Sequence, residues 1–163
     1  MAKRKEEKTN VMRTLEQKKI PYTPHAYPHD GGEAPDGVTV AHSLGLDPAR
    51  VFKTLVTKGA SGGYYVFDIP VAETLDLKKA ARAVGEKSVA MLPARELLPL
   101  TGYVHGGCSP VGMKKPFPTV FHVSALAQET IFVSAGRIGL QVEVKAEELI
   151  ALIGGKIEDI IVS

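Results

Sequence analysis

The stretch VFKTLVT (residues 51–57), followed by YYVFDIPV (residues 64–71), decides the fold. Both segments are rich in β-branched and aromatic residues, which favour strands. Gly59, Gly62 and Gly63 lie between them, where a chain reversal needs conformational freedom. The pattern predicts a β-hairpin, and the rest of the fold is expected to assemble around it.

The segments outside this hairpin alternate between helical and extended patterns. Leu77, Ala80, Ala81 and Val84 follow helical spacing after a potential N-cap at Asp76. Further helices are predicted at 9–19, 38–44 and 146–153, and another begins after Pro93. Strands are predicted at 88–92, 119–123, 130–133, 140–144 and 157–162, and residues 103–105 are strand-like. Residues 21–37 carry four prolines and are expected to be extended and turning. Because strands come in neighbouring runs, we predict an α+β fold with a mixed, curved sheet, in one domain spanning residues 1–163.

Composition excludes several classes of protein. Hydrophobic residues make up 44% and charged residues 23% of the 163 residues, which is typical of a globular domain and not of a disordered chain or a collagen. One cysteine excludes a disulfide scaffold and a cysteine-rich zinc site. The net charge of +2 permits a nucleic-acid partner without demanding one. No apolar run approaches a membrane span, and MAKRKEEKTN lacks a secretion signal, so a cytoplasmic protein is expected.

The glycine-rich loop GGCSPVG (residues 106–112) is the first candidate for chemistry. Glycines let backbone N–H groups point together at a phosphate or a developing oxyanion. A phosphate-binding P-loop is rejected, because Met113 stands where that motif needs lysine. A tight turn between strands remains the plainer alternative.

Lys53 is the second candidate, because it interrupts an otherwise apolar strand. A lysine there can extend to solvent at a sheet edge. Alternatively, a pocket holds it, and its charge anchors a phosphate or polarises a carbonyl. The pattern alone leaves both open.

Nucleophile and metal motifs are weak. Cys108 has His105 nearby in sequence, but a small buried filler is the more common role of a lone cysteine. His25 and His29 have a helical metal-ligand spacing, which Pro24 and Pro28 make meaningless. We therefore predict no metal site, and the residues offer no obvious protein nucleophile.

Several strings together resemble the YbaK/EbsC family. They are HAYPHD (25–30), FKTL (52–55), GGCSPVG (106–112) and VSAGRIGL (133–140), and the likeness runs from the first helix to the final strand. The resemblance implies the barrel-like fold of the editing insertion of bacterial prolyl-tRNA synthetases. It also implies a free-standing enzyme, without a cofactor, that hydrolyses mischarged aminoacyl-tRNA, most similar to the branch acting on Cys-tRNA(Pro), with Cys-tRNA(Cys) as a further substrate.

Site residues carry over by position from this resemblance. Lys53 and Gly106 match catalytic positions, with Lys53 near the terminal adenosine and its phosphate. The matched substrate-binding positions are Tyr27, Gly107, Ser109, Gly112, Ser134, Gly136 and Gly139. Gln141 lies at a polar position that varies within the family and receives no role. The implied partners are the acceptor end of aminoacyl-tRNA and, as a candidate, prolyl-tRNA synthetase.

The implied mechanism needs no protein nucleophile, because an aminoacyl ester is already activated. The pocket positions it, backbone N–H groups stabilise the oxyanion, and the substrate's own thiol attacks the ester carbon. Two alternatives stay open: a protein that binds a nucleotide or aminoacyl-adenosine without cleaving it, and a structural partner of a synthetase.

Overall fold

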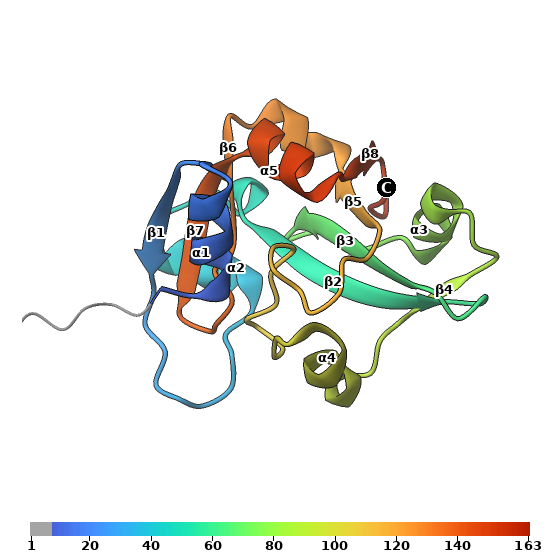
Figure 1. Cartoon of the computed structure of the whole chain (residues 1–163), viewed down its shortest axis with the longest axis horizontal. Coiled ribbons are helices and arrows are strands. Elements are labelled where there is room, and N and C mark those ends of the chain that lie inside the picture. The colour runs from blue at the N-terminus through green and yellow to red at the C-terminus, as the bar shows by residue number, and fades with distance from the viewer. Residues whose placement is uncertain (1–7) are drawn as a thin grey trace, which may run out of the picture.

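Two β-sheets form the centre of the molecule (Figure 1). The structure is a computed structural model that describes residues 8–163. The five-stranded sheet has the order β4 (Val89–Met91), β2 (Phe52–Gly59), β3 (Tyr64–Pro70), β5 (Thr119–His122) and β8 (Lys156–Glu158). The three-stranded sheet has the order β1 (Tyr22–Ala26), β7 (Leu140–Lys145) and β6 (Thr130–Ser134). The pairs β3–β5 and β5–β8 are parallel and the other ladders antiparallel, so the predicted mixed sheet and α+β class are confirmed.

The two sheets meet at a single backbone bridge. Val51, directly before β2, pairs in parallel with Phe132 of β6. Within residues 8–163 the ladder does not continue past this pair, so the predicted barrel-like sheet is two sheets joined at one point, without closure.

Helices cover both sides of the sheets. They are α1 (Asn10–Gln17), α2 (Gly37–Ser43), α3 (Leu77–Val84), α4 (Ala94–Thr101) and α5 (Ala146–Ile153), with short 3₁₀ turns η1 (Pro48–Arg50) and η2 (Val123–Ala127). Asp76 caps α3 by accepting hydrogen bonds from Lys78 N and Lys79 N, as predicted. Left-handed Gly85 and Gly154 end α3 and α5, where a residue with a side chain would be strained.

Strand alternation divides the core by sheet face. On one face, Phe52, Val56 and Val66 pack with residues of α1 and α5, such as Leu15 and Leu149. On the opposite face, two smaller clusters form. Phe67 and Ile69 pack against α3, while Val51 and Phe132 pack against α2. Consecutive residues of β2 therefore serve different faces.

Three sequence predictions are corrected. The segment expected to be merely extended contains β1, which tolerates Pro24 because β1 is an edge strand. Residues 103–105 form no strand; Gly107 N–H donates instead to Val104 O at 3.0 Å, which closes a turn. The final strand is shorter than residues 157–162, because β8 ends at Glu158 and Ile161 makes only a bridge to Leu75.

Residues 1–7, where the absence of a secretion signal was expected, lie outside the described part. Within residues 8–163, no helix combines the length and apolarity needed to cross a membrane. The same range contains no cluster of three or more His, Cys, Asp or Glu side chains arranged to hold a metal ion.

One carboxyl group lies inside the core. Asp68, in the middle of β3, has no exposed surface. Its Oδ1 accepts a hydrogen bond of 2.6 Å from Thr54 Oγ1, and its Oδ2 has no partner in the described part of the chain. Burial raises the pKa of Asp68 to about 7, and the Thr54 hydrogen bond opposes this shift. The native protein therefore favours the protonated acid.

Asp68 should make the protein less stable as the pH rises. The unfolded chain releases this proton near pH 4, whereas the native state holds it to about pH 7, so stability falls between these values. A shift of about three units corresponds to a few kcal/mol. We expect Asp68→Asn to match the wild type near pH 4 and to exceed its free energy of unfolding at pH 8, measured by urea titration across pH.

Asp159→Asn is a control for which the expected change in the free energy of unfolding at pH 8 has the opposite sign. Lys79 lowers the pKa of Asp159, so that change should reduce stability at pH 8. If the difference in free energy of unfolding between Asp68→Asn and the wild type stays constant from pH 4 to pH 8, the raised pKa of Asp68 is contradicted.

Candidate functional site

Two of the site residues predicted from sequence, Lys53 and Ser134, lie where β2 and β6 separate. Lys53 lies two residues beyond Val51, and Ser134 lies two residues beyond Phe132, its bridge partner. Because side chains alternate along strands, Lys53 and Ser134 lie on the same side as the bridge pair. The structure thus places Lys53 and Ser134 on neighbouring strands at the start of the gap between the sheets.

Gln141 extends this polar group across the small sheet. It pairs with Ser134 on β6 and with His25 on β1, so the three residues share one face. Ser134 and Gln141 are each only 6% exposed. The Oε1 atom of Gln141 has no hydrogen-bond partner among the described residues. A buried acceptor without a donor is costly, and such an atom is suited to receive a donor from a ligand.

The turn between β6 and β7 holds the predicted Gly136 and Gly139, both with positive φ (101° and 97°). Gly136 N–H donates to Ser134 Oγ at 3.1 Å, which orients that hydroxyl. Gly139 O accepts a hydrogen bond of 2.9 Å from Tyr27 N, which fixes Tyr27 just after β1. Tyr27 is buried, and the turn therefore brings Tyr27, Ser134, Gly136 and Gly139 together.

The loop of residues 106–112 packs directly against this turn. A Cβ on Gly107 would lie 3.0 Å from the Arg137 Cα, and a Cβ on Gly106 would lie 2.4 Å from that of Ala34. Gly106 also has a φ of 87°, so close approach and backbone conformation both require glycine. Gly107 N–H is used within the loop, whereas the N–H groups of Gly106 and Cys108 have no partner within residues 8–163. These two groups remain as possible oxyanion donors.

Ser109 and Gly112 lie at the other end of the loop. Ser109 is fully buried, and its Oγ accepts a bond from Val111 N at 3.3 Å. Gly112 O accepts a bond of 2.9 Å from Asn10 Nδ2, and the Tyr103 hydroxyl donates to Val111 O. The Asn10 bond anchors the loop to α1, and the Tyr103 bond anchors it to the segment that follows α4. The structure does not place Ser109 and Gly112 beside Ser134, and their role in substrate binding stays a prediction.

Lys53 is half-buried, and its surroundings oppose its charge. Burial lowers the pKa of the Lys53 ammonium, and the carboxylate of Glu73 partly offsets this by raising it. A desolvated cation interacts strongly with an anion brought into the same site.

The Cys108 side chain lies in the core, as the filler hypothesis predicted. It belongs to the cluster that includes Phe52 and Val66, on the opposite face of β2 from Lys53. Burial raises the pKa of its thiol to about 12, with a smaller contribution from Asp68. His105 is exposed and forms no hydrogen bond with Cys108 in the described part. A protonated, buried thiol is a poor nucleophile.

Sequence reasoning gave no role to Gln141 and did not consider Ala34. Gln141 had one signal, a polar side chain between the apolar Leu140 and Val142 of a strand. Ala34 had none, because its contact with Gly106 joins segments distant along the chain.

Glycine turns beside buried polar side chains, with few titratable groups, are typical of a site that binds a ligand or transfers an acyl group. Residues 33–152 match the family model of the aminoacyl-tRNA editing domain. The chain therefore belongs to the aminoacyl-tRNA editing family, as its resemblance to YbaK/EbsC proteins predicted.

Individual relatives agree with this assignment. An Enterococcus faecalis protein named "Putative Cys-tRNA(Pro)/Cys-tRNA(Cys) deacylase EbsC" is 46% identical over 161 residues, covering 98% of each chain. A crystal structure described as "a putative trans-editing enzyme for prolyl tRNA synthetase" is 25% identical, with a TM-score of 0.81 over 94% of this chain and 96% of that one. The crystal structure of hypothetical protein APE2540 has a TM-score of 0.84 at 22% identity, over 94% of this chain and 100% of the other, and shows the fold alone.

Proposed function

We propose that this protein hydrolyses the ester bond of mischarged aminoacyl-tRNA in trans, with Cys-tRNA(Pro) and Cys-tRNA(Cys) as its substrates. The observation that carries the proposal is the set of unpaired polar groups around the glycine turns. The N–H groups of Gly106 and Cys108 and the Oε1 of Gln141 lack partners within residues 8–163. Membership of the editing family and the name of the Enterococcus relative support it.

The loop supplies electrostatic stabilisation in this proposal. The ester oxygen becomes negative as the carbonyl carbon is attacked, and the free N–H groups of Gly106 and Cys108 donate to it. Both groups are fixed before the substrate arrives, because Gly106 and Gly107 pack against Ala34 and the Arg137 backbone. The protein then spends no free energy on reorienting donors during the reaction.

Lys53 and the polar face of the small sheet position the substrate. Lys53 anchors a phosphate at the acceptor end through its charge and takes no covalent part. Tyr27 and Ser134 border the aminoacyl group, and Gln141 Oε1 accepts a hydrogen bond from its ammonium. In this arrangement, binding satisfies an acceptor that the free protein leaves unpaired.

The attacking atom is the substrate's own sulfur. The deprotonated thiol bonds to the ester carbon, the bond from that carbon to the ribose oxygen breaks, and the ribose oxygen takes a proton. The product of this step is a cyclic thioester of cysteine, in which the sulfur is bonded to the former ester carbon. Water then hydrolyses this thioester to free cysteine. A thiolate is far more nucleophilic than a serine hydroxyl, so this route selects cysteine by reactivity. Shape alone would separate such small side chains by only about 1–3 kcal/mol. Prolyl-tRNA synthetase is the proposed partner that delivers the substrate, because a net charge of +2 gives little general attraction to tRNA.

Deacylation of a tRNA panel tests the proposal. We expect cysteinyl-tRNA to be hydrolysed faster than seryl-tRNA and alanyl-tRNA, and alkylation of the cysteine sulfur to abolish the advantage. Equal rates for free and alkylated cysteinyl-tRNA would replace thiol attack with attack by water. If the protein instead protects every ester from hydrolysis, it is a binding protein and not an enzyme.

Lys53→Ala should lower kcat/KM for the preferred substrate about 100-fold or more, the usual effect of losing one preorganised electrostatic group. Thermal unfolding should stay unchanged, because burial already disfavours the Lys53 charge. Lys58→Ala on the same strand is the matched control, since the Lys58 ammonium lies 5.8 Å from the ring of Tyr64 on the surface. Equal losses in both variants, or no loss in Lys53→Ala, would contradict the anchoring role.

Gln141→Leu should separate stability from activity. Replacing an unsatisfied buried acceptor with an apolar side chain of similar size leaves stability unchanged or raises it. The same change removes the proposed acceptor for the substrate's ammonium, so we expect kcat/KM to fall about tenfold or more with an equal or higher Tm. A variant that loses stability and activity together would show that Gln141 is a structural residue.

A further inference from the structure

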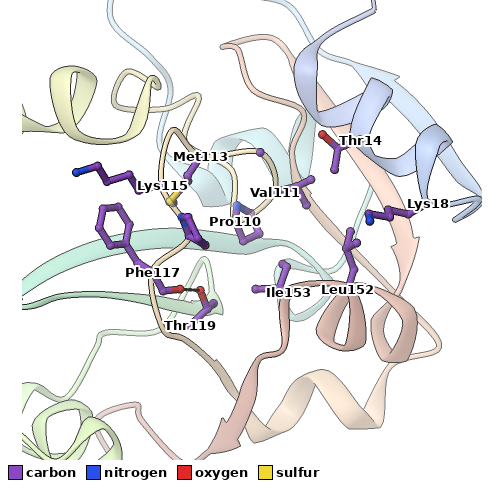
Figure 2. Close-up of a pocket in the computed structure, with 12 residues that line it drawn as sticks. Thr14, Lys18, Pro110, Val111, Met113, Lys115, Phe117, Thr119, Leu152 and Ile153 are labelled. Carbon is purple, nitrogen blue, oxygen red and sulfur yellow. Dashed lines mark hydrogen bonds between the residues drawn. The ribbon is translucent and has the colours of Figure 1, made fainter.

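A cavity whose lining includes neither Lys53 nor Ser134 opens between α1, α5 and the end of the glycine loop (Figure 2). Its volume is about 280 Å³. Thr14 of α1 and Lys18, directly after that helix, form one wall, Leu152 and Ile153 of α5 another, and residues 110–113, 115–117 and 119 the third. We call it the Lys18–Lys115 cavity.

The walls of this cavity combine an apolar interior with cations at its edges. Figure 2 shows Lys18 and Lys115 on opposite sides, with apolar side chains such as Val111 and Ile153 between them. Among residues 8–163, no aspartate or glutamate is part of the lining. An apolar ligand without charge would not require this arrangement, whereas a ligand with an apolar ring and a phosphate would match both parts.

Phe117 offers an aromatic surface inside the cavity. Its ring packs edge-on against Tyr64, with centroids 5.7 Å apart, which fixes its orientation. Pro110, Pro116 and Met113 lie along the same lining. Bases of single-stranded nucleic acids stack on such surfaces without sequence preference, and lysines hold their phosphates. The volume suits one base rather than a large ligand.

The loop of residues 106–112 runs from the proposed catalytic site to the cavity. Gly106 and Gly107 contact the turn beside Ser134, and Pro110, Val111 and Gly112 line the cavity. Five residues lie between Gly106 and Gly112, so the two ends, six Cα–Cα steps apart, lie within about 22 Å. A single strand of a few nucleotides whose 3′ end is at Gly106 can extend along this distance.

We propose that the Lys18–Lys115 cavity binds a nucleotide of the single-stranded acceptor end of tRNA, upstream of the terminal aminoacyl-adenosine. This inference rests on the proposed function, because it assumes that the aminoacyl ester occupies the Gly106 end of the loop. The base stacks among Phe117 and its apolar neighbours, and Lys18 and Lys115 pair with the flanking phosphates. The cavity then adds affinity for tRNA over a free aminoacyl nucleoside.

The test compares two substrates and two double variants of the full chain. The substrates are cysteinyl-tRNA(Pro) and 3′-O-cysteinyl-adenosine, which carries the ester without the upstream nucleotides. The variants are Lys18→Glu/Lys115→Glu and the charge-matched Lys87→Glu/Lys145→Glu, whose exposed lysines are outside the cavity lining. Binding of uncharged tRNA, followed by fluorescence anisotropy against salt, provides a readout that does not depend on catalysis.

The cavity variant should lower kcat/KM for cysteinyl-tRNA at least tenfold and leave cysteinyl-adenosine within twofold of the wild type. Its slope of log affinity for tRNA against log salt should become shallower by up to about 1.4, the value for two lost contacts to single-stranded phosphates. The Lys87/Lys145 variant should keep the wild-type slope.

Three results would overturn the inference: equal losses on both substrates, an unchanged salt slope in the cavity variant, or the same change in the control variant. Failure of the proposed function looks different. In that case the wild type hydrolyses neither ester, while the anisotropy measurement still shows whether the cavity contributes to tRNA binding.

Discussion

The pairing between Val51 and Phe132 joins the two sheets, and the groups around it hold them in register. The Arg50 guanidinium lies 5.1 Å from the centre of the Phe132 ring, and its Nη2 donates to Thr130 Oγ1 at 2.6 Å. Glu143 of β7 accepts from Arg50 and Thr130 and lies 3.1 Å from His25 on β1. Arg50 therefore connects the chain entering β2 to the strands of the small sheet. Only because the sheets are fixed here can β2 and β6 separate beyond this point and leave room for a site.

Strand alternation also keeps the Lys53 cation and the buried Asp68 acid on opposite faces of the sheet. Lys53 and Thr54 are consecutive, so Lys53 faces the gap beside Ser134, and Thr54 faces the core, where it donates to Asp68. If Asp68 shared the face of Lys53, the two would form a buried ion pair, and the lysine would have no charge to offer an incoming phosphate. With Asp68 on the other face, the protein bears the cost of a buried acid and keeps the cation of the site available.

The sequence predicted the elements with regular patterns and failed where a tertiary contact decided the outcome. Residues 77–84 form a helix because apolar spacing, the Asp76 cap and a terminal glycine all agree. The strand β1 was missed, because Pro24 argues against a strand unless the strand is known to be at an edge. The chain fragments 25–30, 52–55, 106–112 and 133–140 pointed to site residues through resemblance. Their meeting depends on the Val51–Phe132 bridge, which joins residues far apart in sequence and has no local signal.

In the proposed mechanism the substrate supplies the nucleophile, and the fixed polar groups of the site position it. Cys108 cannot take that role, since burial raises the pKa of its thiol to about 12 and its side chain lies on the far face of β2. What the loop offers instead is backbone N–H groups, which side-chain substitutions at Cys108 other than proline leave in place. In the proposed mechanism, single side chains such as Gln141 position the aminoacyl group beside the two glycine turns. The turns themselves have little freedom to change, because each glycine is held by positive φ or by contacts as close as that of Gly107 with Arg137. In the proposed mechanism, the backbone of the turns stabilises the oxyanion, the side chains around it position the aminoacyl group, and the thiol of that group selects cysteine.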